Sequence, residues 1–394
     1  GGCRRLVRGP GRALRPGLRG AGVRVVMISK ALLPAAYRGK LAALAQQPDL
    51  DLIAIVPPVW RDRRGVVRLE SGPTPGYRLL VTPLVFNGQY HWYFYPQLGR
   101  LLVELQPDVV HVDEEPYNLA GWQAMRLARR VGARACFFAW QNLRRSYPPP
   151  FCWFERDCYR LAGYAIAGSQ EAAQVLRAKG YTGPLSIIPQ FGVDPDQFAP
   201  AMPPPVPPFV IGYAGGLIAE KGLETLITAA ARLSGEWELR LAGEGEARRR
   251  LQRLAAALGV ADRVAFLARL PSTAMPDFYR GLHVFVLPSR AQPNWKEQFG
   301  RVLIEAMGCA VPVIGSACGE VPCVIGEAGL LFAAGDDRQL GELLARLQAD
   351  PTLRRELGER GRRRVLAHYT HAAIAQATLA VYAALYAGSA RDLA

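Results

Sequence analysis

The sequence predicts an α/β protein of two domains, each with a parallel β-sheet covered by helices on both faces. The chain has 394 residues, of which 50% are hydrophobic and 21% charged, so it is long enough and apolar enough for two cores. Short apolar runs alternate with helical patterns along almost the whole chain, which is typical of strand–helix–strand units. A proline-rich segment interrupts this alternation once. We therefore expect two Rossmann-like domains facing a cleft.

Apolar runs in the first half are short enough to be buried strands. They are continuous rather than alternating, as expected where both faces of a parallel sheet are covered. Helical patterns separate most of them, for example at residues 121–131 and 171–179. The predicted strands are 23–28, 52–56, 79–85, 109–112, 135–139 and 186–188.

The same alternation resumes after the prolines. Helices are predicted to begin at Lys221 and near Gly300, with a last helix from His371 to Tyr386. The predicted strands are 209–214, 238–242, 264–267, 284–287, 311–314 and 330–332. One stripe of the last helix carries Ile374, Thr378, Val381, Tyr382 and Leu385, and the rest is mostly alanine rather than lysine. This pattern favours a helix that packs back towards the N-terminal domain over a membrane anchor.

These features divide the chain into five parts. Residues 1–22 are rich in Gly, Arg and Pro without any period, which predicts a flexible arm. Residues 23–195 form the first Rossmann-like domain, and residues 196–208 form a stiff Pro-rich linker. Residues 209–370 form the second domain, followed by a C-terminal helix and tail at 371–394.

The formal charge of +15 admits three kinds of partner: nucleic acid, an anionic membrane or phosphorylated small molecules. Seven of the fifteen excess charges come from arginines before residue 25, where there is no acidic residue, so eight remain for the rest. No zinc-finger or recognition-helix pattern is present, which argues against nucleic acid. The arginines are at positions 4, 5, 8, 12, 15, 19 and 24.

The cysteines and apolar segments predict a cytoplasmic protein. The seven cysteines are odd in number and lack a C-x-x-C pair, so neither disulfides nor a structural metal site are expected. No apolar core follows the N-terminal arginines, as a secretory signal would require. Residues 366–390 are rich in alanine and too weakly apolar for a membrane span. Peripheral contact with the anionic inner face of the membrane remains an expectation from the charge.

The loop after the strand at 284–287 is the most informative segment. It places Glu297 just before a helix that begins near Gly300, and Glu305 inside that helix, so both carboxylates can face one ligand. The free N–H groups from Gly300 to Val302 and the positive end of the helix dipole favour a phosphate there. This combination predicts a ligand that has both hydroxyls and phosphate.

Two further loops follow strands of the second half. Gly215 and Gly216 let a ligand approach the backbone, and Lys221 can place a positive charge on a diphosphate. The loop at 242–246 resembles the opening of a dinucleotide fingerprint, but Arg248 stands where the third glycine is required. NAD and FAD are therefore discounted.

Taken together, these loops resemble the nucleotide-sugar half of the family 4 glycosyltransferases, which have the GT-B fold. The strongest match runs from Glu297 to Met307 and has the family's Glu-x7-Glu signature, with Phe-Gly after the first glutamate and Glu-Ala-Met at the second. Other matching segments in the second half are 215 with 220–222, 242–245 and 287–289; looser matches in the first half are 107–111 and 188–194.

The resemblance implies transfer of a sugar from a nucleotide diphosphate sugar with retention of configuration, without a required metal or other cofactor. Lys221 would bind the diphosphate and stabilise the departing charge, and Glu297 would contact the transferred sugar. These two are the implied catalytic residues, while Glu305 would accept the ribose hydroxyls. The other implied donor-binding residues are Gly215, Gly216, Gly243, Phe299, Gly300, Arg301 and Val302.

The chain departs from the family's pattern in three places. Gly216 stands where the family usually has an arginine beside the lysine, and Arg301 or Arg290 would have to replace it. The loop at 29–34 lacks the usual glycine pair. The segment 140–142 reads Trp-Gln-Asn where many members have a histidine, and neither amide can act as a general base at neutral pH.

Acceptor-side residues are expected in the first half. Aromatic side chains stand near carboxylates at 87–95 and 112–118, a combination common in sugar sites because rings pack on C–H faces. The acceptor would be a glycan, a lipid-linked glycan or a small molecule with a hydroxyl. The candidate acceptor-side residues are His111, Glu115, Asn118, Gln141 and Asn142.

Other functions remain open at this point. Two glutamates in one loop also suit a glycosidase, a nucleotide-sugar epimerase or another GT-B enzyme, although a glycosidase pair must flank a single glycosidic bond. A non-enzymatic alternative is a polyanion- or membrane-binding protein that uses the arginine-rich arm.

Overall fold

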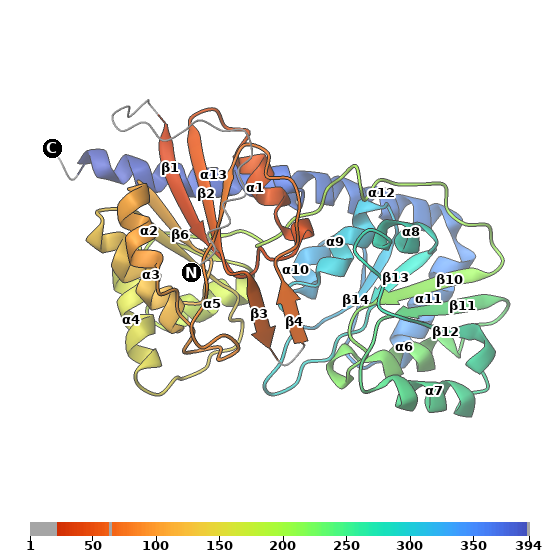
Figure 1. Ribbon diagram of the computed structural model, residues 1–394. Helices are drawn as coiled ribbons and strands as arrows, with labels where there is room; N and C mark the ends of the chain where they lie inside the picture. Colours follow the sequence, from red (N-terminus) through yellow and green to blue (C-terminus); the bar gives the residue numbers. More distant parts are fainter. Residues whose placement is uncertain (1–21, 63–64, 392–394) are drawn as a thin grey trace. The chain divides into compact units, whose positions relative to one another are not determined.

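A computed structural model describes residues 22–62 and 65–391 (Figure 1). The arm predicted at residues 1–22 lies outside the described residues, apart from Gly22. The chain divides into two compact units. Unit 1 comprises Gly1–Gly168, Ala172–Gly192 and Ile374–Ala394, and unit 2 comprises Ser169–Glu171 and Val193–Ala373. Each unit contains one parallel sheet, which confirms the predicted α/β class with two Rossmann-like domains.

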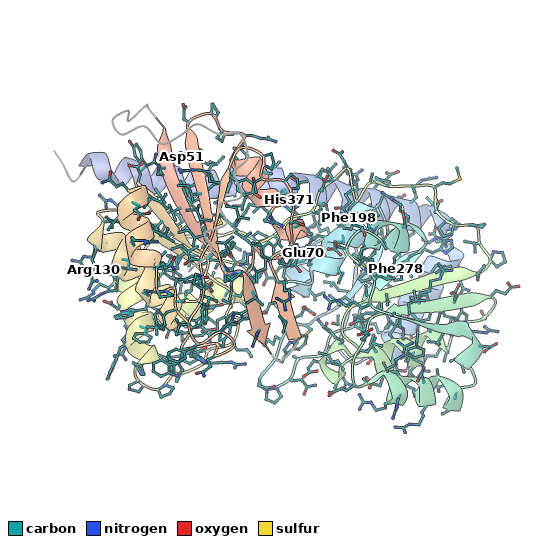
Figure 2. The ribbon with its side chains drawn as sticks, viewed as in Figure 1. Asp51, Glu70, Arg130, Phe198, Phe278 and His371 are labelled. Carbon is teal, nitrogen blue, oxygen red and sulfur yellow. The ribbon has the colours of Figure 1, made fainter. Side chains whose placement is uncertain are left out.

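The sheet of unit 1 has its first strand near the middle. Its described strands are all parallel and follow the order β5-β2-β1-β6-β7-β8-β9. Asp51 in β2, labelled in Figure 2, ties this strand to both of its neighbours, because it accepts from Arg24 Nε of β1 at 2.6 Å and from Arg78 Nη2 of β5 at 3.1 Å. The bounds are β1 Val23–Ile28, β2 Leu50–Val56, β5 Arg78–Val81, β6 Val109–Val112, β7 Arg134–Ala139, β8 Tyr164–Ala167 and β9 Leu185–Ile187.

Helices cover both faces of this sheet, as the continuous apolar strands require. In β1, Val26 and Ile28 face one core, with residues of α2–α5, while Val25 and Met27 face the other, with α1 and α13. A short antiparallel hairpin of β3 and β4 stands apart from the sheet. The bounds are α1 Gly39–Leu44, α2 Leu98–Leu105, α3 Leu119–Arg130, α4 Phe151–Leu161, α5 Gln170–Ala178, α13 His371–Arg391, β3 Val59–Asp62 and β4 Gly65–Arg68, with a 3₁₀ turn at Ala35–Tyr37.

The C-terminal helix α13 belongs to the core of unit 1 from Ile374 onward, which confirms the predicted packing. Its first residue, His371, is labelled in Figure 2. The predicted stripe is buried, and Tyr382 hydrogen-bonds His111 in β6, with 2.8 Å between the hydroxyl and Nδ1. Gly163 makes room for this helix, because a Cβ there would lie 2.7 Å from Leu385 Cδ2.

The sheet of unit 2 is also parallel throughout its described strands, in the order β12-β11-β10-β13-β14-β15. Its helices form two groups, since α6 packs against α7 and α11, and α9 against α8, α10 and α12. The strands are β10 Phe209–Ala214, β11 Trp237–Ala242, β12 Val264–Leu267, β13 Val284–Leu287, β14 Val313–Ser316 and β15 Leu330–Phe332. The helices are α6 Leu223–Ala230, α7 Arg248–Ala257, α8 Met275–Arg280, α9 Arg301–Gly308, α10 Val321–Ile325, α11 Asp337–Ala349 and α12 Pro351–His368, with 3₁₀ turns at Ala219–Lys221 and Ala261–Arg263.

The structure differs from the predicted elements at a few points. The strand β8 was not predicted, because it is only four residues long and Ala165 and Ala167 dilute the β-propensity of Tyr164 and Ile166. The strand expected at 79–85 ends at Val81, before Pro83, which has no N–H to donate to a ladder. The strand expected at 311–314 begins two residues later, after Pro312. The helix expected from Lys221 begins at Leu223, because Gly222 adopts a left-handed conformation.

The contact between α13 and β6 can be tested with Tyr382→Phe. The change removes the hydroxyl and leaves buried His111 Nδ1 without its partner, so we expect a loss of about 1–3 kcal/mol in the free energy of unfolding. Urea denaturation followed by tryptophan fluorescence measures this loss. Tyr386→Phe on the same helix, at a residue that is 51% exposed, is the control and should cost under about 0.5 kcal/mol. Equal losses from both variants would contradict the interpretation.

Candidate active site

The two central strands of unit 2 mark the place where its strand order reverses. β10 leads outward to β11 and β12, while β13 leads to β14 and β15. In open parallel sheets, ligands bind at the carboxyl ends of the strands that flank such a reversal. The loops that leave β10 and β13 at that edge run over 215–222 and 288–300. These are the two loops that carry Lys221 and Glu297.

The backbones of these two loops touch. Gly222 has φ +63°, and a Cβ there would lie 2.1 Å from the carbonyl oxygen of Pro288, so only glycine fits. Arg290 N–H donates to the carbonyl oxygen of Glu220 at 2.8 Å. This contact fixes the position of Lys221, which ends the 3₁₀ turn, against the loop from β13.

Lys221 and Glu297 form an ion pair at this contact, with 2.5 Å between Nζ and Oε2. The same oxygen accepts a hydrogen bond from the buried Ser289 hydroxyl at 2.8 Å. The side chains are 19% and 11% exposed, so the pair is largely shielded from water yet open enough to be reached. An ammonium and a carboxylate at this edge can contact a phosphate and a sugar hydroxyl respectively.

Trp295 completes the surroundings of Lys221. A tight turn, in which Gln292 and Trp295 exchange backbone hydrogen bonds of 2.8 and 3.2 Å, brings the indole over the lysine. Lys221 Nζ lies 5.0 Å from the centroid of the Trp295 ring, within reach of a cation–π interaction. No feature of the sequence singled out this tryptophan, because its contact with Lys221 depends on how the loop folds.

Glu305 lies one turn inside α9. Its Oε1 pairs with Arg301 Nε at 2.9 Å, and its Oε2 accepts from the Tyr279 hydroxyl at 2.8 Å. Burial raises the pKa of Glu305, while Arg301 and Tyr279 oppose the rise by stabilising the charged form. A carboxylate has about four lone-pair sites, so these two contacts leave room for ligand hydroxyls.

The start of α9 has the features of an anion site. Gly300 is the N-cap residue with φ +78°, and no side chain caps the helix, so the N–H groups of Arg301 and Val302 lack partners within the helix. The Phe299 side chain is buried, with its ring 5.8 Å from Tyr369, which anchors the loop just before the helix. The structure therefore groups the predicted residues of this loop around one helix start.

The remaining predicted donor residues lie at neighbouring strand ends. Gly216 O accepts from the Tyr213 hydroxyl at 2.9 Å, while Gly215 N–H donates to Ala242 O at 3.0 Å. Gly243 follows β11 and packs directly on Gly215, since a Cβ on Gly243 would lie 1.9 Å from Gly215 O. These glycines thus bring the ends of β10 and β11 together.

The predicted acceptor-side residues lie in unit 1, and the structure separates one of them from the rest. His111 faces α13 in the core, where burial, followed by the charge of Lys40, holds its pKa well below the ordinary value. Glu115 and Asn118 follow β6, and Gln141 and Asn142 follow β7, at the carboxyl edge of the sheet. The Gln141 amide donates to the Tyr147 hydroxyl at 2.6 Å.

Glu115 has a strongly perturbed carboxyl group at that edge. Its Oε1 accepts from Trp140 N–H at 2.8 Å, and its residue is 8% exposed. Burial raises the pKa of Glu115 to about 7, and the Trp140 hydrogen bond opposes the rise. The carboxyl group is therefore close to half-ionised at neutral pH.

Sequence reasoning missed several residues beside Glu115. Lys30 pairs with Glu114, and Tyr93 donates to the same carboxylate at 2.5 Å. Lys179 pairs with Glu155 at 2.6 Å. Lys30 belongs to the predicted loop at 29–34, so its position was a usable signal. Glu155, in the middle of α4, and Lys179, just after α5, come from segments far along the chain.

The described residues were also searched for metal sites and membrane spans. Within 22–62 and 65–391, no three His, Cys, Asp or Glu side chains are grouped so that they could hold a metal ion. In the same part of the chain, none of the helices is both long and apolar enough to cross a membrane.

The raised pKa of Glu115 predicts a pH-dependent stability. The unfolded carboxyl loses its proton near pH 4.5, whereas the folded one keeps it up to about pH 7, so folding loses stability as the pH rises through this window. Glu115→Gln cannot ionise. Its stability relative to the wild type should therefore rise by roughly 3 kcal/mol between pH 4.5 and 7 and stay level outside that range. Urea denaturation at a series of pH values measures the difference, and a difference that is flat across the window would contradict the assignment.

Comparisons with known proteins agree with this geometry. The family model described as glycosyl transferases group 1 matches residues 196–364, and the glycosyl transferase 4-like domain matches residues 10–189. The lipopolysaccharide core biosynthesis glycosyltransferase LpsE of Rhizobium meliloti (strain 1021) is 34% identical over 296 residues, which cover 73% of this chain and 81% of LpsE.

Solved structures share the fold. Sucrose-phosphate synthase from Thermosynechococcus elongatus superimposes with a TM-score of 0.70 at 22% identity, over 93% of this chain and 100% of that one. Anabaena HepE in complex with UDP gives 0.67 at 16% identity, over 92% and 99% of the two chains. The chain therefore belongs to the group 1, or family 4, glycosyltransferases, enzymes with the GT-B fold that transfer a sugar from a nucleotide-sugar donor to an acceptor.

Proposed function

We propose that the protein transfers a sugar from a nucleoside diphosphate sugar to a hydroxyl of a glycan or lipid-linked glycan, with retention of configuration and without a metal or organic cofactor. The observation that carries the proposal is the Lys221–Glu297 ion pair, which lies on the two loops at the strand-order reversal of unit 2. Such a pair presents a cation and a hydrogen-bond acceptor to one ligand, as a sugar diphosphate requires.

Lys221 is proposed to stabilise the leaving diphosphate. When the bond between the anomeric carbon and the phosphate oxygen breaks, negative charge grows on that oxygen, and a fixed ammonium lowers the energy of this state. Without donor, Glu297 serves as the counterion of Lys221. A bound diphosphate would take over that role and release Glu297 to accept hydrogen bonds from the hydroxyls of the transferred sugar.

The rest of the donor has matching partners around α9. The N–H groups at the start of α9 point to where diphosphate oxygens would bind, and Glu305 suits the two ribose hydroxyls of a nucleotide. Tyr279 and Arg301 hold the Glu305 carboxylate in place. Glu305 is thus proposed to select a nucleotide over a free sugar phosphate.

Arg290 is proposed as the second cation of the phosphate site. Arg301 is already paired with Glu305, whereas the exposed Arg290 pairs with no carboxylate among the described residues. The Arg290 side chain lies against both Gly222 and Gly335. A Cβ on Gly222 would lie 2.9 Å from Arg290 Cγ, and a Cβ on Gly335 would lie 3.3 Å from Arg290 Nη2. Of the two candidate replacements for the family's usual arginine, Arg290 is therefore the better placed.

The name of one relative supports the proposed class of acceptor. LpsE, which is 34% identical, is named as a glycosyltransferase of lipopolysaccharide core biosynthesis. A glycan on a lipid carrier would place the enzyme at an anionic membrane surface, which suits the net charge of +15. The proposed location is the cytoplasm, with peripheral contact at the inner face of the membrane.

A screen of nucleotide sugars tests the reaction. Donors that bind should raise the melting temperature of the protein, since a ligand of the folded state adds RT ln(1+[L]/Kd) to its stability. With an active donor and a lipopolysaccharide core acceptor, release of nucleoside diphosphate and an NMR coupling constant that shows the donor's own anomeric configuration would support retaining transfer. An isomerised nucleotide sugar would instead indicate an epimerase, and an inverted product would overturn retention.

Substitutions in the donor loops should act on different parameters. Lys221→Ala removes a charge-assisted contact to the diphosphate that strengthens as charge grows on the leaving oxygen, so kcat should fall roughly 10- to 100-fold or more. Glu305→Gln should weaken binding of the nucleoside diphosphate by roughly tenfold or more, as isothermal titration calorimetry would measure. Glu246→Gln, at an exposed residue of the loop after β11, is the matched control and should change neither value. Donor binding that is unaffected by Glu305→Gln would refute the ribose assignment.

A further inference from the structure

The central strands of unit 1 mark a second reversal of strand order. β1 leads to β2 and β5, while β6 leads to β7, β8 and β9. By the rule applied to unit 2, a ligand is expected at the carboxyl ends of β1 and β6. The loops at those ends contribute Lys30, Glu115 and Asn118. With Tyr90, Tyr117 and Tyr147 they form the group of side chains called here the Glu115 cluster.

Two buried oxygen atoms in this cluster lack partners. Glu115 Oε2 and Asn118 Oδ1 are each inaccessible to water and accept no hydrogen bond from the described residues. Their residues are 8% and 0% exposed. The other polar atom of each side chain is engaged: Glu115 Oε1 by Trp140 N–H, and Asn118 Nδ2 by the Tyr93 hydroxyl at 3.1 Å. An unpartnered buried acceptor costs about 1–3 kcal/mol, so a ligand that supplies two donors would recover that energy.

Three aromatic rings lie near Glu115. Tyr117 stacks on Tyr147, with centroids 4.3 Å apart, and its hydroxyl is hydrogen-bonded to that of Tyr90. Tyr90 is the most exposed of these three rings, at 42%, so it marks the solvent side of the cluster. Rings of this kind pack against the C–H faces of sugars. The cluster therefore offers both surfaces that a sugar ring needs, an aromatic face and buried acceptors.

The charges around the cluster decide between ligand classes. Lys30 lies over the Tyr90 ring at 5.5 Å and pairs with Glu114, while Lys179 lies over the Tyr147 ring at 4.7 Å and pairs with Glu155. An anionic ligand would meet three carboxyl groups including Glu115, whereas a cationic one would meet two ammonium groups and find in Glu115, with its raised pKa, the one of these carboxyl groups that pairs with no lysine among the described residues. Because the lysines are already neutralised, a neutral ligand faces the smallest penalty.

We infer that the Glu115 cluster binds one neutral sugar ring of the acceptor, which donates hydroxyls to Glu115 Oε2 and Asn118 Oδ1 once the Tyr90 ring has turned outward. The inference rests on the proposed function and names the class of acceptor: a neutral sugar, rather than an amino sugar or a phosphorylated one.

Binding of three sugars to the full chain tests this inference. Saturation-transfer NMR, with UDP present, would compare methyl α-glucoside, glucosamine and glucose 6-phosphate. We expect the neutral glycoside to bind and the two charged sugars to bind at least tenfold more weakly. Glu115→Ala should weaken binding of the glycoside at least tenfold and leave the Kd of UDP unchanged. Glu104→Ala, at an exposed residue of α2, is the matched control and should change neither.

Tyr90→Ala provides a second variant in case Glu115→Ala does not fold, because Tyr90 lies at the exposed boundary of the cluster. Because the Tyr90 ring has to turn outward before the sugar can bind, its removal should strengthen binding of the glycoside rather than weaken it. A charged sugar that binds as well as the neutral one, glycoside binding that Glu115→Ala leaves unchanged or that Tyr90→Ala weakens, or bound UDP with no detectable glycoside would each overturn the inference. Glycoside binding by the cluster in a protein that binds no nucleotide would instead overturn the proposed function alone.

Discussion

The ion pair between Lys221 and Glu297 is the interaction on which the donor half depends. It joins the loops from the two central strands of unit 2, and it is largely screened from water by Trp295 and Ser289. Breaking such a pair without a replacement leaves a charge in a poorly solvated place, which is costly. A donor diphosphate is itself a counterion, so it can replace Glu297 without leaving Lys221 unpaired. The site is thus kept in working geometry by an interaction that its ligand can exchange.

Unit 1 uses ion pairs differently. Lys30 with Glu114 and Lys179 with Glu155 neutralise one another on either side of the aromatic rings, and they leave Glu115 as the carboxyl group without a cation of its own. In unit 2 the paired lysine is the group that meets the ligand, whereas in unit 1 the paired lysines make the surroundings neutral. The same strand-order reversal therefore supports recognition of a charged ligand in one unit and of an uncharged one in the other.

The sequence allowed the fold and the donor loops to be predicted because their signals are local. Continuous apolar strands, the Pro-rich segment and the spacing of Glu297 and Glu305 can all be read along the chain. The surroundings of Glu115 could not be read in this way, since Tyr147, Lys179 and Glu155 come from separate segments joined only by tertiary packing. His111 shows a further difficulty: alternation along β6 turns Val110 and Val112 towards one core and His111 towards α13, although all three look equally close to the loop in the sequence.

The buried position of Glu115 destabilises the folded protein. A carboxyl group with a pKa of about 7 is held there against a cost of roughly 3 kcal/mol when it ionises, and one of its oxygens gains no hydrogen bond in return. A leucine or methionine of similar size would fill the same space without this cost. Residues that destabilise the fold are expected at functional sites, and stabilising interactions elsewhere compensate for them. A ligand hydroxyl could donate a hydrogen bond to the Glu115 oxygen that has no partner. Binding would then recover part of the free energy that this carboxyl group costs the folded protein. At Glu115, therefore, higher affinity for a sugar comes with lower stability of unit 1.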